Sequence, residues 1–313
     1  MSTYDNQLTE MSEEQFRHNQ KEKKVLKTLA HIGIYTVCII FTLLSLIPFW
    51  FMISNATRTT SQIYGKSLSL VPSTHLVENY KALMKTDEKG QASSSGTQNF
   101  DPVTGFRNSF IVSAGATVLA IYFSTLTAYA IVVYDWKLKR AFFTFIMAVM
   151  MIPTQVTAIG FYLMVFRIHL NGTLWPLILP SIASPAMVFF MKQYMQPALS
   201  LEIIQSARID GAGEFYTFNK IALPIMKPAM ATQAIFAFVS SWNNLFLPSI
   251  LLSSNAKLKT LPMMVALLKG DIYKVNMGAL YLAITISILP LFIVYFALSK
   301  YIIAGVALGS VKG

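Results

Sequence analysis

The sequence predicts an all-α integral membrane protein with six transmembrane helices. The 313 residues are 54% hydrophobic, with a mean hydropathy of +0.53, which exceeds the apolar content of ordinary soluble domains. Six segments lack Asp, Glu, Lys and Arg, and each reaches the length of about 18 or more residues that a membrane helix needs. These segments are residues 28–57, 108–134, 141–166, 168–191, 228–256 and 275–299. Unpaired backbone groups are costly in hydrocarbon, so each segment is expected to be helical.

The first apolar segment is expected to remain as a membrane helix. A small-x-small motif, Ser54-Asn55-Ala56, follows it and is typical of signal-peptide cleavage. However, a largely polar region of 27 residues precedes the segment, and its apolar run is longer than the roughly 7–15 residues of a cleavable core. Residues 1–27 are predicted to be either a frayed tail or a surface helix. Cys38 is the single cysteine, so the chain can form no intramolecular disulfide.

The fourth segment is predicted to be kinked, because Pro176, Pro180 and Pro185 lie within it. Each proline removes a backbone donor from the helix. Such prolines are tolerated in a membrane helix when neighbouring helices satisfy the freed carbonyls, which favours a position inside the bundle.

The distribution of Lys and Arg predicts which loops are cytoplasmic. Residues 1–27, 135–140, 192–227 and 300–313 hold 14 of them, and the opposite side holds 11. The difference is clearer near the helix ends, since residues 17–27 hold five basic side chains and the short 135–140 turn holds three. By the positive-inside rule, both termini and the 192–227 loop are expected in the cytoplasm.

The loop at residues 54–107 is then extracytoplasmic. Its centre, 85–96, is polar and rich in serine and is predicted to be flexible. Residues 72–80 are predicted to form a capped turn that leads into a short helix. The loop is interpreted either as a cap over the outer mouth of the bundle or as a plain surface linker.

A charged loop at residues 196–228 interrupts the apolar segments and is predicted to hold two short helices. Ser200 is a suitable N-cap for the first helix, which Asp210-Gly211 should end because glycine adopts the left-handed turn without steric penalty. The second helix is expected at about 212–222, with Phe215 and Phe218 on one stripe, before Leu223-Pro224 stops it. Neither helix can span a bilayer, so an apolar stripe here must pack against the bundle or a partner.

This loop resembles the ATPase-coupling loop of the binding-protein-dependent ABC importer permeases. That motif reads Glu-Ala-Ala, three residues, Gly, nine residues, Ile-x-Leu-Pro; the chain has Gln205-Ser206-Ala207, Gly211 and Ile221-Ala222-Leu223-Pro224 at the same spacing. Gln205 and Ser206 stand where the motif has Glu and Ala. Residues 151–156, 207–212, 241–244, 300–305 and 311–313 further resemble the maltose-type, carbohydrate-uptake branch, and the similarity covers residues 28–313.

The resemblance implies a type I ABC importer fold and an ATP-driven sugar or oligosaccharide importer in a bacterial or archaeal cell membrane. The implied partners are a second homologous permease, two ABC ATPase subunits and an extracellular or periplasmic sugar-binding protein. The chain itself is expected to catalyse nothing and to bind no cofactor, with ATP and Mg²⁺ held by the ATPases. The residues implied in ATPase coupling are Gln205, Ser206, Ala207, Asp210, Gly211, Glu214, Phe215, Phe218, Leu223 and Pro224.

Trp242, Asn243 and Asn244 are candidates for the substrate pathway. They lie inside the predicted helix 228–256, and adjacent amides in hydrocarbon are costly unless they face a cavity or pair across helices. An indole can stack on a sugar face while amides bind its hydroxyls. The equally open alternative is that the three residues hold helices together.

The sequence lacks features that are expected of an ATPase and of a secondary transporter. The sequence contains no phosphate-binding G-x-x-x-x-G-K-[ST] loop, so ATP hydrolysis requires another chain. An ion-gradient-driven secondary transporter usually carries ionisable groups at mid-membrane, and the six segments have no Asp, Glu, Lys or Arg. A role as a membrane scaffold would explain the apolar segments but would give the two-helix loop no function. The four histidines show no metal-ligand spacing, and no metal site is expected.

Overall fold

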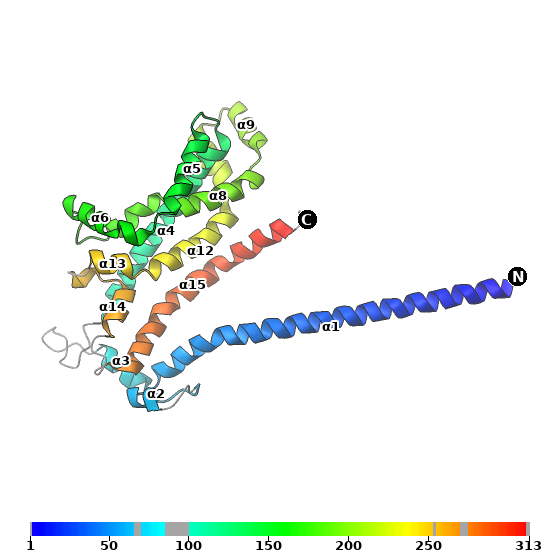
Figure 1. Ribbon diagram of the computed structural model, residues 1–313, viewed down its shortest axis with the longest axis horizontal. Helices are drawn as coiled ribbons and strands as arrows, with labels where there is room; N and C mark the ends of the chain where they lie inside the picture. The colour runs from blue at the N-terminus through cyan, green and yellow to red at the C-terminus, as the bar shows by residue number, and fades with distance from the viewer. Residues whose placement is uncertain (1, 66–69, 85–99, 253–254, 270–274, 311–313) are drawn as a thin grey trace.

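The computed structural model describes residues 2–65, 70–84, 100–252, 255–269 and 275–310. In these ranges all regular structure is helical (Figure 1). The longer helices are α1 (Ser2–Ala56), α4 (Pro102–Val133), α5 (Lys139–Met150), α6 (Thr154–Arg167), α8 (Pro185–Ala198), α12 (Lys227–Trp242) and α15 (Met277–Ser310). The shorter ones are α2 (Thr60–Gly65), α3 (Leu76–Met84), α7 (Trp175–Ile178), η1 (Leu179–Ile182), α9 (Leu201–Ile209), α10 (Glu214–Thr217), η2 (Phe218–Ala222), α11 (Leu223–Ile225), α13 (Phe246–Leu251), η3 (Ala256–Leu258) and α14 (Leu261–Leu267).

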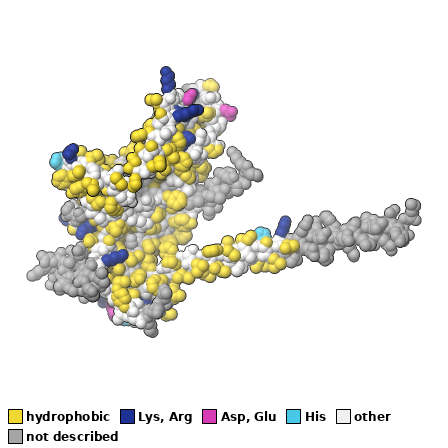
Figure 2. All heavy atoms as spheres, viewed as in Figure 1, with side chains coloured by type: hydrophobic (Ala, Val, Ile, Leu, Met, Phe, Trp, Pro, Cys, Tyr) yellow, Lys and Arg dark blue, Asp and Glu magenta, His cyan; other side chains and the backbone are white. Residues whose placement is uncertain are grey.

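The described helices include four to six candidate membrane crossings, compared with the six that the sequence predicts. Four helical stretches are long and apolar enough to cross a bilayer alone: Leu26–Ala56, Pro102–Val133, Trp175–Ala198 and Met277–Ser299. Two bent pairs, α5 with α6 and Glu214–Ile225 with α12, reach this length only if each pair is counted as one crossing, which gives an upper limit of six. The second pair includes helices of the charged 196–228 loop. The bundle is therefore an all-α membrane fold, and apolar side chains cover most of its visible face between the α9 end and the α2 end (Figure 2).

The third segment is not the single straight helix that the sequence predicts. The chain bends by 96° between α5 and α6. Pro153 lies at the break with extended backbone angles, and a proline both lacks a donor and disfavours helical geometry at the residue before it. The bend carries α6 across the bundle instead of along it (Figure 1).

The kink predicted in the fourth segment is confirmed. α7 passes into the 3₁₀ turn η1, and α8 begins afresh with Pro185 in its first turn. A proline there loses no helical hydrogen bond. The helical stretch extends to Ala198, beyond the predicted end at 191. The charged Lys192 lies in this extension, with its Nζ 4.3 Å from the centroid of the Phe143 ring.

The fifth segment is also broken, since α12 ends at Trp242 and α13 begins only at Phe246. A further bend of 78° separates α12 from the short helices that precede it.

The second and sixth segments form continuous helices as predicted, with α4 beginning earlier, at Pro102. Asp101 caps α4, and hydrogen bonds from Thr104 and Val103 hold the pKa of its carboxyl below the ordinary value.

α4 lies at the centre of the bundle, where it packs against both α8 and α12 (Figure 1). A core cluster toward the α9 end joins α4, α8 and the 196–228 loop through Tyr129, Met191 and Phe218. A second cluster toward the opposite end joins α12, α14 and α15 around Trp242 and Leu261. α4 therefore contacts the 196–228 loop near one end and α14 near the other.

α1 packs on the bundle only near its C-terminal end. Phe49 contacts Phe292 of α15 with ring centroids 5.5 Å apart, and the rest of α1 projects away from the other helices (Figure 1). Residues 2–27 continue this helix, in line with the helical alternative for the N-terminal region. The side chains from Leu26 to Trp50 are exposed and largely apolar, as expected of a surface that lipid or another membrane helix covers.

The predicted short helix of the outer loop is confirmed as α3, which begins at Leu76. Asn79 is buried and donates two hydrogen bonds, to the carbonyls of Ala56 at 2.9 Å and Arg58 at 2.8 Å. The backbone N–H of Met277 donates to Thr60 Oγ1 at 3.0 Å. These bonds join α2 and α3 to the ends of α1 and α15. The predicted flexible stretch 85–96 lies outside the described residues.

Candidate functional site

The first arm of the 196–228 loop is α9, which is held against the bundle on one side. Ser200 caps it as predicted, because its hydroxyl accepts a hydrogen bond from the Glu202 N–H at 3.2 Å. Ile204 is 1% exposed and belongs to the core cluster around α4. The opposite side of α9 is exposed, so the arm is anchored on one face only.

The turn after α9 depends on glycine. Gly211 has φ +79°, in the left-handed region, which confirms the predicted turn. The Ala212 N–H donates to the carbonyl of Ala207 at 2.9 Å, and the Gly211 N–H donates to that of Arg208 at 3.1 Å. These bonds satisfy carbonyls at the end of α9 and send the chain back toward α4.

The second arm differs from the single helix predicted at 212–222. It begins at Glu214, passes through the π-helical turn η2 and continues through α11 to Ile225. Leu223-Pro224 therefore does not stop the helical path, because Pro224 falls in the first turn of a new segment, where no N–H is required. The Asn219 side-chain amide donates to the Phe215 carbonyl at 2.8 Å, which satisfies an acceptor next to the π turn.

The predicted common stripe of Phe215 and Phe218 is wrong. Phe218 is 1% exposed, with its ring centroid 5.7 Å from that of Tyr122 and 5.3 Å from that of Tyr129 on α4. Phe215 is 73% exposed. Packing against α4 separates the two rings: one anchors the arm and the other is free for contact.

A polar cluster closes the turn between the two arms. Arg208 Nε lies 2.7 Å from Glu214 Oε1, and the Tyr134 hydroxyl donates to Glu214 Oε2 at 2.5 Å. The Arg208 guanidinium also lies over the Tyr134 ring, 5.4 Å from its centroid. The hydrogen bonds from Arg208 and Tyr134 lower the pKa of the Glu214 carboxyl, a loop group outside the predicted membrane helices. The sequence did not predict this cluster, since 80 residues separate Tyr134 from Glu214.

The exposed side of the loop carries a surface of large apolar side chains, which we call the loop surface. It consists of Ile209, Phe215 and Tyr216, which are 86%, 73% and 58% exposed. Among the other residues implied in coupling, Gln205, Ser206, Asp210, Gly211, Glu214 and Pro224 are exposed, Leu223 is partly buried and Ala207 is buried. Ile209 and Tyr216 were not among the residues that the sequence implied in coupling. The signal that could have identified them is a large apolar side chain on each side of the glycine turn.

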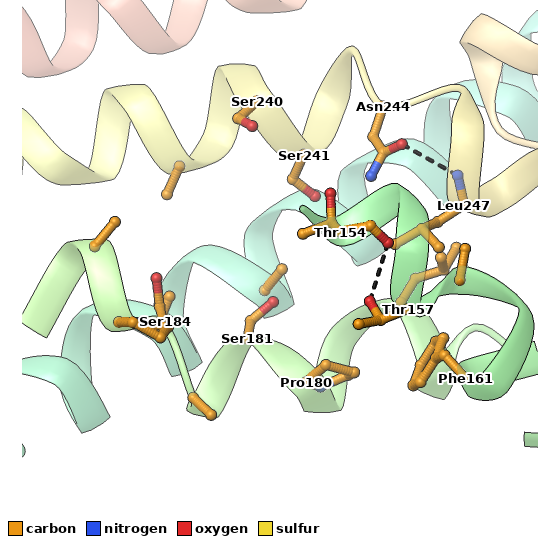
Figure 3. A pocket seen from close by; sticks show the side chains of 18 of the residues that line it. Thr154, Thr157, Phe161, Pro180, Ser181, Ser184, Ser240, Ser241, Asn244 and Leu247 are labelled. Atoms are coloured by element: carbon orange, nitrogen blue, oxygen red, sulfur yellow. Dashed lines mark hydrogen bonds between the residues drawn. The ribbon is translucent and has the colours of Figure 1, made fainter. Parts of the chain in front are cut away.

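A cavity of about 1100 Å³ opens within the bundle. Its wall is largely apolar, and a few polar side chains project into it. Ser241 and Asn244 face Thr154 and Thr157 of α6 across this space (Figure 3). Further polar lining comes from Gln233, Ser181, Ser184 and Ser240. The bend at Pro153 is what brings the start of α6, and hence Thr154 and Thr157, to the cavity.

The structure separates the three predicted pathway residues and shows that they do not lie mid-helix. Trp242 is the last residue of α12 and is 1% exposed, and its indole N–H donates to the Ser287 carbonyl at 3.0 Å. It is therefore a packing residue that joins α12 to α15. Asn243 is exposed at the C-terminal cap but is not part of the cavity wall. Of the three, Asn244 lines the cavity, and its Oδ1 accepts from the Leu247 N–H at 3.4 Å (Figure 3).

The described residues contain no group of three or more His, Cys, Asp or Glu side chains arranged to hold a metal. The chemistry that the cavity offers is hydrogen bonding by hydroxyl and amide groups beside apolar surface. Such a wall suits an uncharged polar molecule in transit.

A membrane bundle with a largely apolar cavity that a few polar side chains enter, and with an anchored loop at one end, is typical of a transport permease. Over residues 120–307 the sequence matches the family described as "Binding-protein-dependent transport system inner membrane component". The chain belongs to this family.

Relatives of full length and a solved structure agree with this assignment. The arabinooligosaccharides transport system permease protein of Halalkalibacterium halodurans is 32% identical over 296 residues, which cover 94% of this chain and 99% of that one. The lactose transport system permease protein of Rhizobium radiobacter is 28% identical, with coverage of 91% and 98%. The crystal structure of a bacterial ABC transporter involved in import of the acidic polysaccharide alginate shares the fold, with a TM-score of 0.66, 21% identity and coverage of 87% and 96%. The chain is thus an importer permease subunit with the type I importer fold.

Proposed function

We propose that this permease carries an oligosaccharide across the membrane and is driven by separate ATPase subunits that dock on the loop surface. It forms half of the pathway, and a second homologous permease forms the other half. Two ABC ATPases hold ATP and Mg²⁺, and an external sugar-binding protein delivers the substrate. Both termini and the loop face the cytoplasm. The proposed cargo follows from relatives named for arabinooligosaccharide and lactose transport.

The observation that carries this proposal is the two-sided construction of the loop. Ile204 and Phe218 fasten it to the core, while Ile209, Phe215 and Tyr216 lie exposed on the other side. Large apolar side chains clustered on a surface outside the membrane favour a protein contact. This importer permease has no phosphate-binding loop of its own, so an ATPase subunit is the partner that we expect to bind the loop surface.

Co-purification from mild detergent tests the assembly. The full-length tagged chain should bring down an ATPase and a second membrane permease, and its membranes should take up radiolabelled arabinotriose or lactose only in the presence of ATP. The chain purified free of ATPase subunits should hydrolyse no ATP. Uptake that follows an ion gradient without ATP would contradict the proposal, as would hydrolysis by the isolated chain.

Cysteine labelling tests the pathway. In a Cys38→Ser background, Asn244→Cys should react with a water-soluble thiol reagent in the nucleotide-free or the ATP-trapped complex, because Asn244 lines the cavity. Ala283→Cys is the buried control, since Ala283 is 0% exposed and should label only after denaturation. Asn244→Cys that stays unlabelled in both states, yet labels when denatured, would remove this residue from the pathway.

A further inference from the structure

Arg208, Glu214 and Tyr134, which we call the loop clamp, come from three separate elements. Arg208 lies in the last turn of α9, Glu214 is the first residue of α10, and Tyr134 is the C-terminal cap of α4. Glu214 uses both carboxylate oxygens, one toward Arg208 and one toward Tyr134. The same guanidinium also covers the Tyr134 ring. Each of the three side chains therefore contacts the other two.

The loop clamp crosses the glycine turn, which is the part of the loop where the backbone can rotate most freely. The two arms meet at Gly211, where a Cβ would meet no other atom within 4 Å and where glycine restricts backbone rotation least. The Arg208–Glu214 pair crosses this turn and ties the end of the first arm to the start of the second. With the turn bridged, the arms can move as one body.

The third member connects that body to the bundle. Tyr134 follows directly on α4, which packs against α8 and α12 and lines the cavity with Val112, Ala116 and Ala120. Beneath the loop clamp, the Tyr129 ring contacts those of Tyr134 and Phe218 at 6.0 and 5.3 Å. Polar and aromatic contacts therefore connect the loop directly to α4, the helix that borders the cavity.

We propose that Arg208, Glu214 and Tyr134 are positioning residues for energy coupling, which make the two arms of the loop and the end of α4 move together when the ATPase moves the loop surface. The proposal rests on the function proposed above. None of the three residues needs to touch substrate or nucleotide. Their role is to convert a movement at the loop surface into a movement of α4.

The test measures coupling separately from assembly. Arg208→Glu, Glu214→Arg and the double exchange Arg208→Glu/Glu214→Arg are each purified as the full complex, together with Tyr134→Phe. Arabinotriose uptake and ATP hydrolysis are measured in proteoliposomes and normalised to the ATPase bound. Lys220→Gln, which removes an exposed charge from the same loop, is the matched control.

Each single charge reversal should lower the sugar transported per ATP hydrolysed by up to about fivefold, the range of a partly exposed ion pair. The double exchange should restore much of the ratio, Tyr134→Phe should lower it less than the reversals, and Lys220→Gln should leave it unchanged. An unchanged ratio of sugar transported to ATP hydrolysed in both single reversals would overturn the proposal. So would a loss that is confined to ATPase attachment, or a double exchange whose ratio is no higher than that of the single variants. A wild-type complex without ATPase or ATP-dependent uptake would instead overturn the proposed function itself.

Discussion

Gly211→Val is expected to abolish most sugar uptake while the membrane bundle stays intact. Gly211 has φ +79°, and a side chain in this left-handed region costs on the order of 1–2 kcal/mol, with a β-branched one at the upper end. Such an energy corresponds to a roughly 5–30-fold change in the population of the native turn. Relief of the strain would displace α9 from α10, and hence Ile209 from Phe215. Uptake and ATPase co-purification measure the effect, with insertion and pairing with the second permease retained.

Two variants isolate the backbone conformation as the cause. Gly213→Val, two residues away, adds the same side chain at φ −69°, and no atoms surround a Cβ there, so it should transport nearly as the wild type does. Gly211→Asn should retain more activity than Gly211→Val, because asparagine tolerates the left-handed region. Normal uptake and normal ATPase attachment in Gly211→Val at wild-type expression would remove the loop as the coupling element.

Gly278→Ala is expected to loosen the end of the bundle formed by α2, α3 and the start of α15. A Cβ at Gly278 would collide with the backbone carbonyl of Arg58 and with the side-chain amide of Asn79, whose Oδ1 would lie only 2.6 Å away. Overpacking of this kind costs about 1–3 kcal/mol, and it also displaces the buried Asn79 from its bonds to Ala56 and Arg58. The thermal unfolding midpoint of the purified complex should fall, and protease should cleave the loop at residues 54–107 sooner.

Gly65→Ala is the matched control for this effect. Gly65 ends α2 at the same end of the bundle, and a Cβ there meets nothing within 4 Å. Its unfolding midpoint should stay at the wild-type value. An equal fall for both variants, or no fall for Gly278→Ala, would show that contact with Asn79 and Arg58 does not hold α15 in place.

Much of the coupling loop was predictable from the sequence because its signals are local. Ser200 accepts a bond from a residue two positions away, and Gly211 takes the left-handed turn that its own lack of a Cβ permits. The division between anchoring and exposed side chains was not predictable in this way. Phe215 and Phe218 are alike in type and lie one turn apart, and the position of α4 decides which of them is buried.

The pathway shows the same division. Trp242, Asn243 and Asn244 were correctly marked as unusual for a membrane helix, but their roles depend on neighbours distant in sequence. Ser287 takes up the indole N–H of Trp242, whereas the end of α12 turns Asn244 toward Thr154 and Thr157 (Figure 3). The loop clamp likewise depends on Tyr134 and Glu214, which no local pattern connects.

The sequence alone determined the membrane class, the six apolar segments, the kink in the fourth and the glycine turn of the loop. These follow from charge-free length, proline and backbone freedom, which are properties of single segments. The tertiary structure alone decided the 96° bend between α5 and α6, the burial of Trp242 and Phe218, and the three-way contact of Arg208, Glu214 and Tyr134. The physical reason is that burial, bond partners and the direction of a broken helix are set by packing between segments far apart in the chain, and no single segment encodes them.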